Sequence, residues 1–371
     1  MFIQQFTDLR EWLLDKNDLR TLGDLSWGGF SAMKDNPVTM SIFQKFAPDE
    51  DSTVAIAPTN LDERVRSAEE IRKKVAGLLA GTQRFEFKSD RFTVIKEKPI
   101  VYWWDDEFLE HYAKTPKLGE IAPVKSGMQT GDNTRFIRKP WELAKPKLRI
   151  VRFDEQLLDV PPLAWVPYVQ GSRGRLWFEP ISSLIDWTEC GLQVKVLSEY
   201  RVGATIRNPD FFFTPGVAFT PIGSLFTARS HRYRSICDTM GSSVFPQQGL
   251  ATAVSLMNSQ LAKNVLTALN PTVHFQVGDV NRLPLFPIES AEEIFAQLDR
   301  AFTEHEAARE TSVEFKQPGA SCWNYAQEWA QQAVDREPGK PLPAWNPVYE
   351  QPLAVNWVSY AIGVALGRFG A

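Results

Sequence analysis

Cysteine is scarce in this 371-residue chain, which contains only three, far apart at Cys190, Cys237 and Cys322. An odd number at such wide spacing argues against a disulfide framework and a zinc site, because both need cysteines paired at suitable separations. The four histidines likewise have no partner at the spacing of a metal site or a catalytic triad. We therefore expect no metal site and assign no catalytic residue.

Long hydrophobic runs are also missing. No apolar stretch approaches the roughly 18 residues needed to cross a bilayer, and the first residues (MFIQQFTD) lack the basic and apolar blocks of a signal peptide. We expect a cytoplasmic protein with no membrane partner.

A glycine-rich nucleotide-binding loop is absent as well. The segment Trp27-Gly28-Gly29-Phe30 is too short for the GxGxxG pattern that follows a strand and opens a helix. It predicts a plain turn.

The charge is unevenly distributed. The net charge of −4 argues against a nonspecific polycation. Residues 121–234, however, hold sixteen Lys and Arg against ten Asp and Glu, a net charge of +6, and the rest of the chain carries −10. Because phosphate attracts basic surfaces, the middle of the chain is the part suited to nucleic acid.

The first 115 residues have the pattern of an α/β unit. Helical apolar spacing over 5–15 precedes a strand-like run at 19–25, and 38–46 and 53–57 indicate an antiparallel hairpin at a sheet edge. Asn60 and Glu63 predict a capping box for a helix that ends at Gly81. We assign 1–60 to an α/β domain and 61–115 to a helical connector.

The remaining chain divides into a β-rich and a helical part. Residues 116–290 are rich in strand and loop patterns, interrupted by one helix from Thr252 to Leu269 that ends at Asn270-Pro271. Residues 291–371 have helical patterns, and we expect this region to be incomplete. The predicted fold class is mixed α/β (α+β).

Several ordered blocks of sequence resemble the PglX-type adenine-specific DNA methyltransferases of BREX phage-defence systems. The blocks are 99–104 (PIVYWW), 118–127 (LGEIAPVKSG), 128–138 (MQTGDNTRFIR), 241–245 (GSSVF), 256–261 (LMNSQL), 270–279 (NPTVHFQVGD) and 360–369 (YAIGVALGRF). The resemblance implies that 1–60 are the last elements of a methyltransferase-like sheet. It further implies that 116–290 form the target-recognition domain.

The resemblance also implies a cofactor, S-adenosylmethionine, for the complete enzyme. The family's glycine-rich loop and Asn-Pro-Pro-Tyr motif are not in this chain, and Asn208-Pro209-Asp210-Phe211 lacks the second proline. We interpret that segment as a turn, name no catalytic residue, leave cofactor-binding residues unassigned and expect no cofactor for this chain alone.

A protein that recognises a DNA sequence needs side chains that bind phosphates and side chains that bind base edges, and the central domain contains both kinds. Each segment also has a structural interpretation, as a turn that satisfies its own backbone, a hairpin tip or a solvated loop. We favour the densest basic run, at 229–234. The candidate DNA contacts are Gln129, Thr130, Asn133, Arg135, Arg138, Arg173, Arg175, Arg229, His231, Arg232 and Arg234.

Two functions follow from these patterns. The chain is expected to recognise double-stranded DNA for an adenine-specific methyltransferase, acting with that enzyme's catalytic portion. Alternatively, it is a non-catalytic subunit or truncated product that binds a separate methyltransferase or another defence-system protein. The edge of an incomplete N-terminal sheet motivates the second hypothesis.

Overall fold

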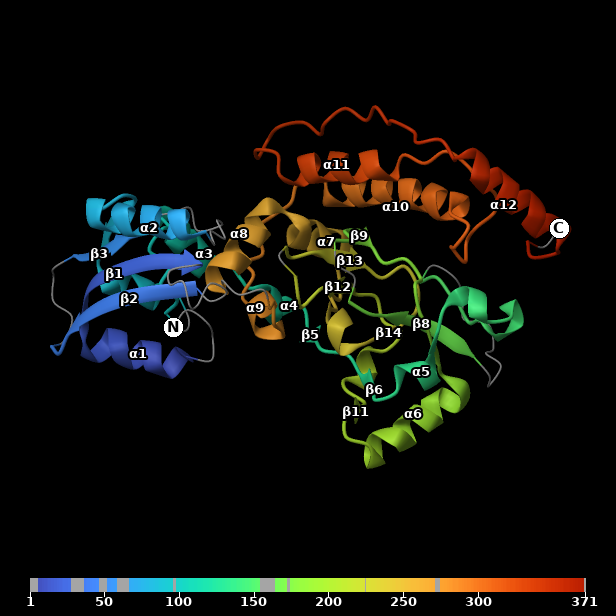
Figure 1. Ribbon diagram of the computed structural model, residues 1–371, viewed down its shortest axis with the longest axis horizontal. Helices are drawn as coiled ribbons and strands as arrows, with labels where there is room; N and C mark the ends of the chain where they lie inside the picture. The colour runs from blue at the N-terminus through green and yellow to red at the C-terminus, as the bar shows by residue number, and fades with distance from the viewer. Residues whose placement is uncertain are drawn as a thin grey trace. The chain divides into compact units, whose positions relative to one another are not determined.

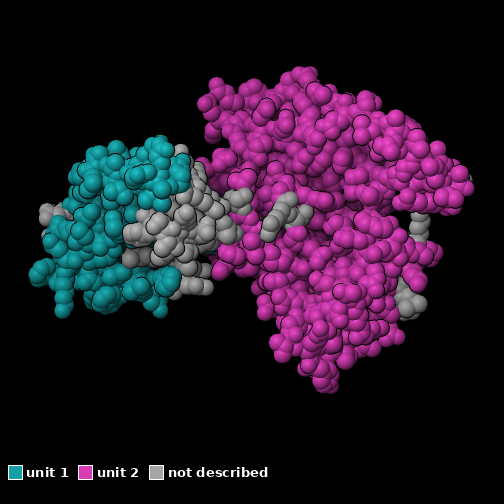
Figure 2. All heavy atoms as spheres, viewed as in Figure 1, with its two compact units in different colours: residues 1–116, 267–272 teal, residues 117–266, 273–371 magenta. Residues whose placement is uncertain are grey.

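The computed structural model describes residues 6–27, 37–46, 52–58, 67–95, 98–153, 164–171, 174–223, 225–270 and 274–369. The chain forms two compact units (Figure 2): unit 1 comprises 1–116 and 267–272, and unit 2 comprises 117–266 and 273–371. Both helices and mixed sheets are present (Figure 1), which confirms the predicted mixed α/β class. Within these described ranges, no helix has both the length and the apolar character required to cross a membrane.

Unit 1 contains a four-stranded sheet with the order β2-β1-β3-β4. Strand β1 is antiparallel to β2 and parallel to β3, and β3 is antiparallel to β4. The strands are β1 (Asp18–Trp27), β2 (Pro37–Gln44), β3 (Thr53–Ile56) and β4 (Arg84–Phe87).

The predicted hairpin of 38–46 with 53–57 is wrong, although both strands exist. Strand β1 lies between them. Its Leu19, Leu22 and Leu25 are buried, so β1 occupies a central position and takes a partner on each side. The Gly28-Gly29 turn falls outside the described residues.

The helices of unit 1 are α1 (Thr7–Lys16), α2 (Ala68–Ala80) and α3 (Asp106–Lys114), with the short 3₁₀ turn η2 (Ser89–Val94). Helix α2 starts after Ser67, which forms a capping box with Glu70, and ends at Gly81 with φ of 65°. The end at Gly81 is confirmed, whereas the predicted cap at 60–63 lies outside the described residues. Strand β4 belongs to the sheet, so this part of 61–115 is not a helical connector.

Unit 2 is built on short strands, as its strand-rich patterns predicted. Its sheets have the orders β5-β15-β12-β13-β9, β14-β8-β10-β7 and β11-β6. The strands are β5 (Val124–Lys125), β6 (Gln129–Thr130), β7 (Ile137–Arg138), β8 (Trp165–Val169), β9 (Trp177–Phe178), β10 (Leu184–Asp186), β11 (Ala204–Thr205), β12 (Val217–Phe219), β13 (Ala228–Ser230), β14 (Ile236–Cys237) and β15 (Ser243–Val244).

Short helices connect these strands. They are α4 (Leu118–Ile121), α5 (Asn133–Phe136), α6 (Thr188–Tyr200) and α9 (Val277–Asn281), together with the 3₁₀ turns η3 (Pro140–Glu142), η4 (Lys145–Lys147), η5 (Pro209–Phe211) and η6 (Thr239–Gly241).

The single helix predicted for 252–269 is divided into α7 (Leu250–Asn258) and α8 (Gln260–Leu269). Ser259 between them is extended, with ψ of 152°, and its hydroxyl accepts a hydrogen bond from the Ala262 amide at 3.1 Å. The buried Asn258 side chain bonds both backbone groups of Ala228 in β13, at 3.0 and 3.1 Å. A new helix therefore begins where the first one is tied to the sheet.

The C-terminal part is helical, as predicted, with α10 (Ala291–Ala308), α11 (Trp323–Val334) and α12 (Ala354–Ala365). Helices α10 and α11 run side by side (Figure 1), with the Phe302 and Trp323 rings 4.8 Å apart. Phe302 also stacks on Phe178 of β9, with ring centroids 5.3 Å apart. Helix α10 thus covers the β9 edge of the five-stranded sheet.

Candidate nucleic-acid interface

Arg229 lies in β13, between β12 and β9, and is fully buried. Its Nε is paired with the Glu179 carboxylate, and its other nitrogens donate to the Thr220 hydroxyl at 2.9 Å and the Gln170 carbonyl at 3.2 Å. A guanidinium enclosed in this way has no access to a phosphate in this conformation.

His231 is also buried, and its Nε2 lies 3.1 Å from the Ser243 hydroxyl. Burial, with a smaller effect of the nearby Arg229 charge, lowers the pKa of His231 to about 3. The imidazole is therefore neutral near pH 7 and has no charge to offer to DNA.

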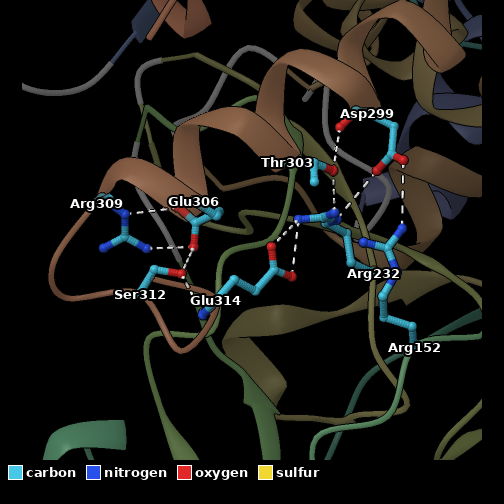
Figure 3. A network of polar contacts seen from close by, with 8 residues as sticks. All are labelled: Arg152, Arg232, Asp299, Thr303, Glu306, Arg309, Ser312 and Glu314. Carbon is cyan, nitrogen blue, oxygen red and sulfur yellow. Dashed lines mark hydrogen bonds and ion pairs between the residues drawn. The ribbon is translucent and has the colours of Figure 1, made fainter. Parts of the chain in front are cut away.

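Arg232 connects the chain after β13 to α10 and to the segment that follows α10 (Figure 3). Its guanidinium lies 3.3 Å from a carboxylate oxygen of Asp299 and 3.3 Å from one of Glu314, and donates to the Thr303 hydroxyl at 2.8 Å. Arg152 shares Asp299 at 3.6 Å. Only 2% of the Arg232 side chain is exposed.

The prediction that 229–234 form an exposed phosphate contact is therefore wrong for Arg229, His231 and Arg232. The sequence run is basic, but the sheet and α10 enclose it, and internal carboxylates neutralise both arginines. Arg234 alone stays half-exposed, with its guanidinium 5.5 Å from the centre of the Phe153 ring.

The predicted loop at 129–135 combines a rigid base with exposed polar groups. The buried Thr130 hydroxyl donates to the Asn133 side chain, and Asp132 caps α5 by accepting from the Arg135 amide at 3.1 Å. Asp132 also pairs with Arg201 at 3.2 Å. The structural-turn interpretation, in which Asp132 and Asn133 bond their own backbone, thus holds for Asp132, whereas the Asn133 side chain bonds the buried Thr130 hydroxyl.

The other side chains of this loop reach solvent. Gln129, Asn133 and Arg135 are exposed, and Arg135 donates to the Gln193 side chain of α6 at 2.9 Å. Arg138 is half-buried, with its guanidinium 5.8 Å from the centre of the Trp165 ring.

The glycine-rich segment is described only in part. Arg175 is exposed, and Gly174 before it has a φ of 72°, so a turn bearing an available guanidinium is present. Arg173 lies outside the described residues.

The segment that carries the excess charge extends beyond the predicted contacts at 129–138 and includes Lys139, Lys145, Lys147 and Arg149, which were not predicted. Residues 121–152 contain eight Lys and Arg against two Asp and Glu, whereas 153–234 contain eight of each. The whole excess of +6 therefore lies in 121–152. The charge count of the sequence contains this signal, whereas the local density of basic residues at 229–234 does not indicate where the net excess lies.

Much of this charge reaches the surface. Lys139 and Lys147 are exposed, and Arg138 and Arg149 are partly exposed. Lys139 also donates to the Ser182 carbonyl at 3.1 Å, which ties the segment to the chain just before β10. We call the region 129–149 the basic strip.

Asn208 has the structural role predicted from its motif. Its amide donates to the Ser126 carbonyl at 2.8 Å, and its φ of 50° places it in a tight turn before η5.

Among the residues that the structure describes, no group of three His, Cys, Asp or Glu side chains is arranged to hold a metal ion.

Two curated proteins are similar to this chain, whereas no protein-family model matches it. The adenine-specific methyltransferase PglX of Lacticaseibacillus casei (strain Zhang) is 28% identical over 238 residues, 60% of this chain and 20% of the relative. The adenine-specific methyltransferase BrxX of Escherichia coli O9:H4 (strain HS) is 24% identical over 301 residues, 79% of this chain and 23% of the relative. The chain thus spans about a fifth of the length of these relatives.

These matches confirm the resemblance to PglX-type adenine-specific methyltransferases. A crystal structure of the type IIG restriction endonuclease BpuSI also aligns, with a TM-score of 0.30 and 12% identity over 78% of this chain and 39% of that chain. A structural likeness at this level carries no argument about function.

Proposed function

We propose that this chain recognises the double-stranded DNA target of a site-specific adenine methyltransferase in a phage-defence system. The observation that carries the proposal is the basic strip, where the excess positive charge and exposed hydrogen-bonding side chains follow one another along the chain. The similarity to adenine-specific methyltransferases supplies the context.

The strip offers two kinds of group. Lys139 and Lys147 suit phosphates, which set register without reading sequence. Gln129, Asn133 and Arg135 suit base edges, because amides pair with adenine and guanidinium with guanine in the major groove. Their short, hydrogen-bonded turn limits the conformational entropy lost on binding.

The test is duplex affinity measured over a series of salt concentrations. Each phosphate contact contributes about 0.9 to the slope of log affinity against log salt. We expect Lys147→Ala to reduce that slope by about one, while Lys340→Ala, at an exposed lysine outside the strip, leaves it unchanged. Binding that is absent, or independent of salt, contradicts the proposal.

S-adenosylmethionine would be the cofactor of the complete enzyme. The residues of this chain do not fit the catalytic motif, because Asn208 is followed by a single proline and its amide holds the Ser126 carbonyl. We therefore derive no methyl-transfer step from this chain, and a catalytic portion is the implied partner.

A second candidate function, as a subunit that binds a methyltransferase catalytic portion or another defence-system protein, is favoured by α12. Val355, Val358 and Ile362 of α12 and Leu366 just after it recur at helical spacing, and each is more than half exposed. Exposed apolar stripes of this kind mark protein contacts. We expect Ile362→Glu to abolish co-purification with the catalytic portion while duplex binding persists, and retained co-purification would count against the idea.

A further inference from the structure

Trp141 is an exposed tryptophan within the basic strip. It is 59% exposed, against 57% for Trp12 and 46% for Trp357. Trp187, Trp323 and Trp329 of unit 2 pack against other rings, for example Trp187 against Phe212. An indole left in water inside a charged segment is a feature that folding does not explain.

The turn that carries Trp141 is firmly held. The neighbouring Pro140 is buried, the Lys139 amide donates to the Glu142 carboxylate at 2.6 Å, and the Glu142 amide donates to the Lys139 carbonyl at 3.0 Å. The Lys139 side chain adds the bond to the Ser182 carbonyl. The ring is thus presented on a preorganised support, which reduces the entropy lost when it binds.

The charge along the chain on both sides of Trp141 is mostly of one sign. Residues 138–149 contain five Lys and Arg and one acidic residue, Glu142, whose carboxylate is already bonded to the Lys139 amide. Basic side chains that follow a phosphate backbone, with an aromatic ring among them, form the arrangement on which nucleic-acid bases stack. An acidic protein surface would suit the charges but gives no specific use to a flat exposed ring.

We propose that Trp141 stacks on a DNA base that has left the duplex stack, so that the basic strip prefers DNA with a locally opened base over intact duplex. Within an intact duplex both faces of a base are covered by its neighbours, and a ring reaches a face only where the stack is interrupted. This inference rests on the proposed DNA-binding function.

The experiment compares the full chain binding to two duplexes of equal length, one matched and one with a single unpaired 2-aminopurine. A stacked base contributes about 1–3 kcal/mol, so we expect the unpaired duplex to bind about 5- to 150-fold tighter. Stacking on the indole should also quench the 2-aminopurine fluorescence. Trp141→Ala should remove both effects, while Trp141→Phe retains part of each and Trp357→Ala retains both in full.

The outcomes separate the two claims. A preference that persists in Trp141→Ala overturns the stacking proposal, and so does a wild-type chain that binds both duplexes equally. In the second case, salt-dependent binding of the matched duplex leaves the proposed function standing. Failure to bind either duplex overturns both.

Discussion

The Arg229 guanidinium is paired with the Glu179 carboxylate in the interior of unit 2, and both side chains are almost fully buried. This ion pair converts the strand at 228–230 from an expected DNA-contact segment into part of the core. A buried arginine contributes to the stability of the fold, whereas an exposed arginine can bind DNA. The sequence does not distinguish these two roles, and the ion pair assigns Arg229 to the first.

The first prediction concerns this pair. Arg229→Ala should lower the free energy of unfolding by about 3–5 kcal/mol, because it leaves Glu179 buried without a counter-charge. The double variant Arg229→Met with Glu179→Leu should recover most of the loss, since apolar residues of similar volume replace such pairs well. Urea denaturation measures both. A stable Arg229→Ala variant with weakened duplex binding would show instead that Arg229 serves DNA.

The second prediction concerns Arg232, whose guanidinium joins the β13 region to Asp299 and Thr303 of α10. Arg232→Ala should expose the amides of α10 to faster hydrogen exchange, because it removes a nearly buried cation that bridges the two elements. Lys340→Ala, at an exposed position, is the control. Unchanged exchange in α10 would show that the ring contacts of Phe302 hold the helix alone.

The third prediction is a pH dependence of stability. Burial lowers the pKa of His231 from its ordinary 6.5 to about 3. Between these values the unfolded chain binds the proton and the folded chain does not, so this residue makes stability fall as the pH drops from 6.5 toward 3, by about 1.4 kcal/mol per pH unit. Comparing urea unfolding of wild type and His231→Gln across this range isolates the effect. Parallel profiles for the two proteins would contradict the assignment.

The fourth prediction uses two glycines with similar backbone angles. Gly131 has a φ of 69°, and a methyl group added there would lie 2.8 Å from the Ala204 side chain, whereas Gly174 has a φ of 72° and open space around it. Gly174→Ala should therefore lose only about 1 kcal/mol through backbone strain. Gly131→Ala should lose more and displace the loop that carries Gln129 and Asn133.

Duplex binding of these two variants provides a functional measurement. We expect Gly131→Ala to reduce discrimination between a target and a mismatched duplex, while Gly174→Ala preserves it. Equal discrimination in both variants would place the reading residues outside the 129–135 loop.

Features that depend on neighbouring residues were predicted correctly. Helix α2 ends at Gly81 because glycine readily adopts the left-handed backbone conformation that terminates a helix. The C-terminal helices follow from apolar residues at helical spacing. Both signals act within one or two helical turns. The break at Ser259 escaped prediction because Asn258 bonds a strand 30 residues away in sequence. The apolar spacing of residues 252–269 does not indicate that Asn258 bonds Ala228 in β13.

The sequence by itself determined where the charge lies, since the excess of +6 can be counted between 121 and 152, and it determined the resemblance to adenine-specific methyltransferases. Only the tertiary structure decided which cations are available. Arg229 and Arg232 meet Glu179, Asp299 and Glu314 across 50 to 82 residues of chain. Burial is a property of the packed fold, because it depends on which distant carboxylates and sheets close around a side chain.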